Sequence, residues 1–134
     1  MGNQTLSDLL GAVERIGPLV AEHAAAAEAD RQLSGAVYQA MYDAGLFAML
    51  ARKAYGGLEL HSTACIRVWE AIARIDAAAA WNLVMNQAIA AYSAWLPPKG
   101  VAELFSAGIP TVADRKSTRL NSSHSGESRM PSSA

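Results

Sequence analysis

The fold of this chain is limited most strongly by the helical spacing of its apolar residues, which recurs without any clear strand-like alternation. The spacing is clearest at Cys65, Val68, Trp69 and Ile72, which stand at positions i, i+3, i+4 and i+7 and so share one helix face. A half-buried strand would alternate apolar and polar residues, and no stretch does so over a usual strand length. The sequence therefore predicts an all-α fold, a helical bundle of about five helices joined by short links.

Capping and turn residues suggest where these helices begin and end. Side chains that can cap a first helical turn precede four of them, at Thr5 or Ser7, Ser34, Ser62 and Asp76. The helices expected from these caps and from the apolar spacing cover residues 5–29, 35–44, 63–75 and 77–96. Pro98 suits the first turn of a short fifth helix, and Gly45 suits the left-handed position after the second.

Glycine and proline are expected to shape the backbone at two further places. Gly17-Pro18 falls inside the first helix, where we expect a kink or a break because proline removes a backbone donor. Residues 46–55 read as an extended apolar connection, and Gly56-Gly57 as a turn in which Gly57 takes a positive φ.

The composition changes abruptly at residue 114. Residues 1–113 hold seven Lys/Arg and ten Asp/Glu, whereas residues 114–134 hold four and two, with Leu120, Met130 and Ala134 as their apolar side chains. Such a segment cannot bury enough surface to offset its chain entropy, so we predict a disordered tail. Its letters DRKSTRLNSSH, and later SRMPSSA, are also what a common sequencing adapter encodes when translated. We interpret residues 1–113 as the natural domain and 114–134 as an adapter-derived, non-native tail.

Charge and cysteine content exclude several classes of function. The net charge of -1 offers no basis for capturing nucleic acid or an anionic membrane, so neither partner is expected. We also expect no signal peptide and no transmembrane run. The single cysteine, Cys65, cannot form an intrachain disulfide and stands on an inner helix face, where a core role is expected. These features fit a cytoplasmic protein.

The sequence lacks the motifs that usually carry chemistry. It contains no GxGxxG and no P-loop, and His23 and His61 have no second ligand at a metal-binding spacing. We therefore expect no metal and no catalytic residue, and the sequence identifies no cofactor-binding residue.

Four segments, in this order, resemble the N-terminal helical domain of the acyl-CoA dehydrogenase family over nearly all of residues 5–113. They are DAGLF at 43–47, AYGGL at 54–58, WEAIARIDAAAAW at 69–81 and AELFSAG at 102–108. Ala51 departs from the family pattern, because a proline is usual near that position.

The resemblance implies a flavoprotein oxidoreductase whose FAD contacts and catalytic base come mostly from later domains. The parent enzyme would then dehydrogenate acyl-CoA thioesters at a CH–CH group and pass electrons to an electron-transfer flavoprotein or to oxygen. It would form a homo-oligomer at full length. The 134-residue fragment would lack the base and most of the flavin site, and would be inactive.

The resemblance also implies substrate-binding residues in this domain. The helix that matches residues 77–96 lies beside the acyl chain in the family, and Trp81, Val84, Met85 and Ala88 match positions that can face it. For each of these residues, plain packing in the bundle core is the alternative.

Two other functions stay open at this point. Two-component flavin monooxygenases that hydroxylate aromatic substrates share the fold, and they often carry a histidine further along this helix. In this chain Asn86, Gln87 and Ile89 stand in that region, and the absence of a histidine there weakens the monooxygenase interpretation. A non-enzymatic helical domain that binds a partner protein is the third possibility.

Overall fold

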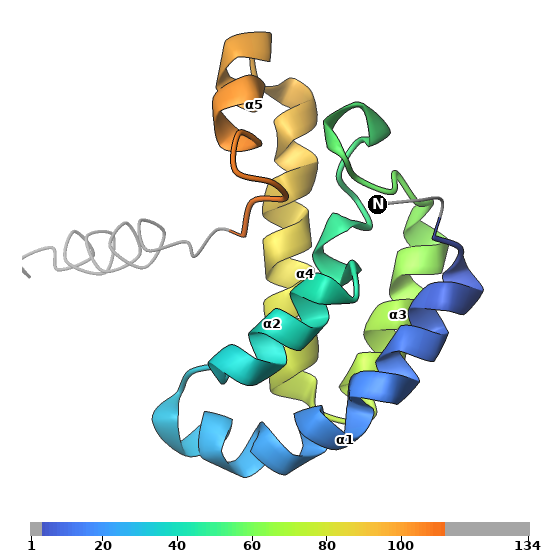
Figure 1. The fold of residues 1–134 in the computed structure, drawn as a ribbon, viewed down its shortest axis with the longest axis vertical. Coiled ribbons are helices and arrows are strands. Elements are labelled where there is room, and N and C mark those ends of the chain that lie inside the picture. Colours follow the sequence, from blue (N-terminus) through green and yellow to red (C-terminus); the bar gives the residue numbers. More distant parts are fainter. Residues whose placement is uncertain (1–3, 112–134) are drawn as a thin grey trace, which may run out of the picture.

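The computed structural model describes residues 4–111, which form a bundle of five α-helices with three short 3-10 helices between them. The α-helices are α1 Leu6–Asp30, α2 Gly35–Asp43, α3 Ser62–Ala73, α4 Ala77–Tyr92 and α5 Pro98–Leu104, and the 3-10 helices are η1 Leu46–Ala48, η2 Lys53–Tyr55 and η3 Ser93–Trp95. In Figure 1, α4 runs along the middle of the molecule, α3 and the first half of α1 lie to one side, and α2 crosses it. The described part of the chain contains no strand, so the predicted all-α fold is confirmed. The predicted boundary at residue 114 and the tail 114–134 lie outside it.

Three of the predicted caps make the expected hydrogen bonds. The Thr5 hydroxyl accepts from the backbone of Asp8, whose carboxylate accepts in return from the Thr5 N–H at 2.8 Å, which forms a capping box. Ser34 caps α2 and Asp76 caps α4 through their side-chain oxygens. Helix α3 begins at Ser62, one residue earlier than predicted. Its cap is His61 and not Ser62, because the His61 ring accepts a hydrogen bond from the backbone N–H of Thr63.

Helix α1 is continuous through Pro18, so of the predicted kink or break, the break is wrong. Proline removes one backbone donor, yet the residues on both sides keep helical geometry and Gly17 packs closely against Ile75. Figure 1 shows the helix changing direction near its middle, as a proline kink would produce. The helix ends at Arg31, which takes a left-handed conformation and donates to the last turn.

The connection after α2 is more compact than predicted. Gly45 takes the expected left-handed conformation, with φ of 76°, but the next residues form η1 and η2 and not an extended strand. The chain then folds back, so that the N–H of Leu58 donates to the carbonyl of Ala48 at 2.9 Å and that of Leu60 to Met49 at 2.8 Å. An extended path would have left these buried backbone groups without partners.

The turn at Gly56-Gly57 is present, but the glycine with the positive φ is not the predicted Gly57. Gly56 has the positive φ, 85°, whereas Gly57 lies so close to Ala51 that a Cβ there would overlap the Ala51 carbonyl oxygen. Both positions favour glycine, the first for its backbone angle and the second for its lack of a side chain.

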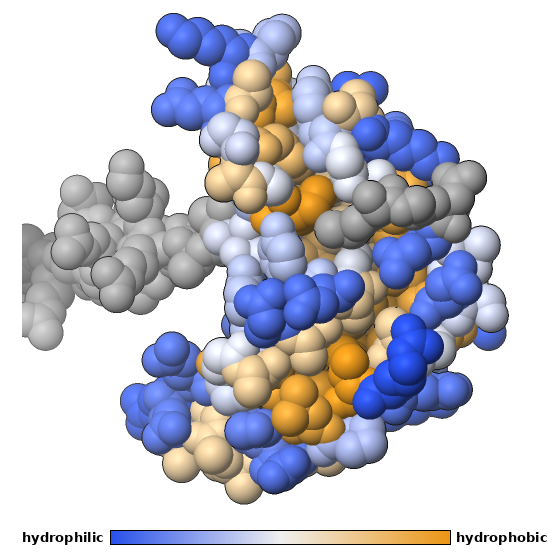
Figure 2. All heavy atoms as spheres, in the orientation of Figure 1, coloured by the Kyte–Doolittle hydropathy of each residue, from blue (hydrophilic) through white to orange (hydrophobic). Residues whose placement is uncertain are grey.

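The core lies where α1, α2, α3 and α4 meet η1. Helices α3 and α4 form the most extensive pairing, and α1 packs mainly on α3. The largest fully buried side chains include Leu9, Met41, Met49, Ile72 and Leu83. Figure 2 shows that apolar surface still reaches the outside between α1 and α2, in the lower half of the view, so polar side chains do not cover this face completely.

Candidate functional site

Helix α4 carries no charged side chain on any face, and Asn82, Asn86 and Gln87 are the polar residues that interrupt its apolar sequence before Tyr92. Residues 77–96 contain no charged side chain. One face of the helix, including Ala79, Leu83 and Ala90, is fully buried against α3, α1 and η1. The opposite face exposes the large apolar side chains of Trp81, Met85 and Tyr92, and is therefore the first candidate for a binding surface.

That opposite face carries a continuous row of Trp81, Met85, Ala88 and Tyr92, which we call the outer stripe. These residues lie three or four positions apart and so on one side of the helix, over a length of about 16 Å. Trp81 and Tyr92 are each 66% exposed and Met85 is 39% exposed, while Ala88 is partly buried. Of the six large apolar residues that are exposed in the described part of the chain, five belong to α4, η3 or the residue that follows them.

The structure brings the four predicted site residues onto one side of α4, but not all into one pocket. Trp81, Met85 and Ala88 belong to the outer stripe, and Val84 lies at its edge. Packing in the bundle core was the alternative for Trp81, and its exposure contradicts that alternative.

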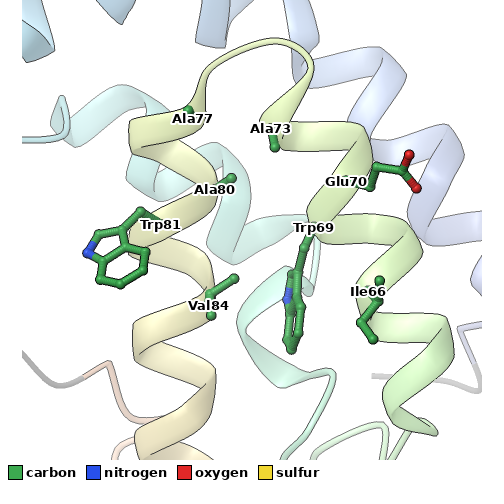
Figure 3. Close-up of a pocket in the computed structure, with 8 residues that line it drawn as sticks. All are labelled: Ile66, Trp69, Glu70, Ala73, Ala77, Ala80, Trp81 and Val84. Atoms are coloured by element: carbon green, nitrogen blue, oxygen red, sulfur yellow. The ribbon is translucent and has the colours of Figure 1, made fainter.

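A groove of about 360 Å³ lies between α3 and α4, beside the outer stripe. Figure 3 shows Trp69 projecting into the space between the helices with Val84 turned toward it, while Trp81 projects from α4 to the outside. The residues that line the groove are Ile66, Trp69, Glu70, Ala73, Ala77, Ala80, Trp81 and Val84. The alanines leave room at the crossing, and the lining is almost wholly apolar.

Trp69 is held in the groove by a polar contact that the sequence did not reveal. Its indole Nε1 donates to Oε1 of Gln87 at 3.0 Å, and Nε2 of Gln87 donates to the carbonyl of Leu46. Gln87 is completely buried, although glutamine is usually found at the surface. A glutamine within an otherwise apolar helix face was the one signal that could have pointed to this contact.

The two other chemically notable side chains are structural. Glu70 lies at the rim of the groove, points away from it in Figure 3, and pairs with Arg74 at 2.7 Å in an exposed ion pair. Cys65 is fully buried, and that burial raises the pKa of its thiol, which agrees with the predicted core role. Neither side chain is placed to act on a ligand in the groove.

The α3–α4 groove does not fit FAD, the cofactor implied by the resemblance. The FAD diphosphate would need cationic side chains or free helix N-termini. The one charged residue that lines the groove, Glu70, is an acid that points away from it, so the groove offers no cation for the diphosphate. In residues 4–111, moreover, no cluster of His, Cys, Asp or Glu could hold a metal ion, and no helix has the length and hydropathy that crossing a membrane requires.

Comparison with known proteins bears on this domain as a whole. The family model described as acyl-CoA dehydrogenase, N-terminal domain, matches residues 12–96, which is more than half of the 134-residue chain. The match includes the groove and the whole outer stripe. Neither curated proteins nor solved structures gave a match to the chain.

Proposed function

Because this chain belongs to the acyl-CoA dehydrogenase family as its N-terminal domain, we propose that it forms one wall of the acyl pocket in an FAD-dependent oxidoreductase. The parent enzyme would act on acyl-CoA thioesters and oxidise the CH–CH group next to the thioester carbonyl. Electrons would pass to an electron-transfer flavoprotein or to oxygen, and the full-length enzyme would be a homo-oligomer.

The observation that supports this proposal is the uncovered apolar face of α4. A thin acyl chain needs an apolar wall with small or flexible side chains, and Ala88 and Met85 provide these one turn apart. Trp81 and Val84 would extend the wall toward the α3–α4 groove. The role of these four residues is to bind and orient the acyl chain and to exclude water from it, and no proton transfer is assigned to them.

The competing function is that of a flavin-dependent aromatic hydroxylase, which would need a polar donor facing its phenolic substrate. Asn86 is the candidate on this helix, but its Nδ2 donates to the carbonyl of Asn82 at 2.8 Å. One of its two N–H groups is therefore occupied by its own helix, and its side chain lies about 100° from the centre of the wall at Met85. This geometry favours the acyl-CoA substrate.

The decisive experiment uses the longer gene from which this domain comes. We expect purified enzyme to contain flavin whose absorbance bleaches on addition of acyl-CoA thioesters in the absence of oxygen and NADH. If no thioester bleaches the flavin, and NADH with a flavin reductase supports hydroxylation of a phenol, the aromatic hydroxylase is correct instead.

A variant tests the wall itself. In that enzyme, Ala88→Trp should raise KM for long acyl chains at least about tenfold while changing KM for the shortest chains much less. Ala25→Trp adds the same side chain to an exposed position on α1 and serves as the control. Equal KM values for all chain lengths in Ala88→Trp would remove Ala88 from the pocket.

The 134-residue chain by itself is proposed to be inactive and free of flavin. Titration of the purified chain with FAD should show no saturable change in flavin absorbance or fluorescence, since the groove has no group for the diphosphate. Stoichiometric binding of FAD would contradict this part of the proposal.

A further inference from the structure

We propose that the α3–α4 groove is a side pocket for the far end of the acyl group, and that Trp69 makes it select an acyl group that ends in an aromatic ring. This inference rests on the proposed function and deepens it, because it names the class of thioester that the parent enzyme would prefer.

The groove is continuous with the proposed acyl wall. Trp81 belongs to the outer stripe and Val84 lies at its edge, and both residues also line the groove. Figure 3 shows Val84 turned into the space between the helices and Trp81 at its outer side. An acyl chain that follows the stripe along α4 can therefore turn into the groove at these two residues.

The groove has no polar group that a ligand would have to satisfy. Glu70, its one charged lining residue, points away and pairs with Arg74 at 2.7 Å. The indole N–H of Trp69 is already donated to Gln87, so the ring presents only carbon to the groove. A hydrocarbon end would thus be accepted without loss of a hydrogen bond, whereas a polar end would give up water and find no partner.

The indole of Trp69 is also held in place before a ligand arrives. Gln87, which is completely buried, accepts from the indole and donates to the carbonyl of Leu46. A side chain that is already ordered loses little conformational freedom on binding. Gln87 is therefore a positioning residue, and Trp69 is the residue that contacts the ligand.

The size of the groove suits a ring better than a straight chain. Its lining covers residues 66–73 of α3 and 77–84 of α4, and each stretch is about 10 Å long. Over that length, a volume of about 360 Å³ corresponds to a mean cross-section of roughly 36 Å². At van der Waals contact distances, a straight alkyl chain fills roughly 20 Å² of this section, and a benzene ring with its attached methylene fills most of it.

A ring gains further from contact with the tryptophan. Aromatic pairs in offset or edge-to-face contact are stabilised beyond the area that they bury, by roughly two- to twelvefold in affinity. Ala73, Ala77 and Ala80 leave the space beside the indole open for such a ring.

NMR of the 134-residue chain tests the groove by itself. The chain has three tryptophans, and replacing the exposed Trp81 and Trp95 with phenylalanine assigns the remaining indole N–H signal to Trp69. Benzyl alcohol should shift the Trp69 signal saturably and bind at least about threefold more tightly than hexanol. Ala73→Phe, at an exposed lining position, should fill the groove and abolish the shift, whereas Ala25→Phe on α1 should not. No saturable shift, equal shifts at Trp95, or equal binding of hexanol overturns the aromatic selectivity.

Kinetics of the longer enzyme test the link to the acyl group. Among acyl-CoA thioesters of graded length, those that end in a phenyl ring should have KM values at least about threefold lower than their cyclohexyl or straight-chain counterparts. Ala73→Phe should abolish this preference and Ala25→Phe should keep it. If straight-chain thioesters bleach the flavin but a phenyl end brings no advantage, this inference fails and the proposed function stands. If no thioester bleaches the flavin, the proposed function fails and this inference fails with it.

Discussion

The indole of Trp69 and the side-chain amide of Gln87 form a hydrogen bond of 3.0 Å that joins α3 to the middle of α4. The same glutamine reaches the carbonyl of Leu46, which lies in η1. One buried side chain therefore connects two helices and the compact segment that follows α2. It also fixes the position of the tryptophan that lies in the groove.

Replacing Gln87 with methionine keeps the length of the side chain but removes both hydrogen bonds. The Trp69 N–H and the Leu46 carbonyl would lose their partners, at a cost of about 1–3 kcal/mol for each group left buried and unpaired. Chemical denaturation should show this loss in the free energy of unfolding. Gln39→Met, at an exposed position on α2, should change it by less than about 0.5 kcal/mol, and equal effects at the two positions would refute the role of Gln87.

The two adjacent glycines should differ in their tolerance of alanine. Gly56→Ala adds a Cβ into open space and loses stability only through its left-handed backbone, about 1–2 kcal/mol. Gly57→Ala would force the backbone of Ala51 to move, so its loss in the free energy of unfolding should be the larger of the two. Urea denaturation of both variants measures the order, and a reversed order would show that the close approach to Ala51 is not required.

The capping box at the start of α1 should make stability depend on pH. Hydrogen bonds from the Thr5 backbone N–H, and next from its hydroxyl, hold the pKa of Asp8 below its ordinary value of 3.8. A carboxyl group with a lower pKa in the folded chain stabilises the fold above its unfolded pKa, and this contribution is lost as pH falls through the folded pKa. Stability should therefore decline below about pH 4, and by less in Asp8→Asn than in the parent chain. Identical pH profiles from urea denaturation of the two proteins would exclude this contribution.

The single thiol should report on opening of the core. Cys65 is fully buried and burial raises the pKa of its thiol, so the reactive thiolate is scarce and inaccessible in the folded chain. Labelling with a thiol reagent should be at least about 100-fold slower in buffer than in denaturant. Rapid labelling of the native chain would mean that α3 opens without global unfolding.

Local capping chemistry predicted most helix starts, because it depends on residues next to one another. Thr5, Ser34 and Asp76 each bind the first turn of their own helix, and Gly45 needs only its own backbone freedom. The predicted end of α4 is too late, since the apolar pattern continues through η3 although the α-helix stops at Tyr92. The spacing of apolar residues alone does not distinguish the end of an α-helix from a 3-10 helix that follows it.

Contacts between distant residues could not be predicted in the same way. The link from Gln87 to Leu46 spans 41 positions, and the contact of Gly57 with Ala51 depends on how the chain folds back. The exposure of Trp81 is a tertiary property as well, because large apolar residues stand on both the buried and the exposed face of α4. The sequence identified which helix carries the candidate site, and the structure showed which of its faces is uncovered.

Helix α1 is continuous through Pro18, but this proline divides it into two parts that should open separately. Proline has no amide hydrogen, so the carbonyl of Glu14 loses its partner in the middle of the helix. The first part buries Leu9, Ala12 and Val13, whereas no residue after Val20 in this helix is buried. In native-state hydrogen exchange, amides of residues 22–30 should exchange through local fraying, and those near Val13 only when the core opens. One geometric helix would then behave as two cooperative units.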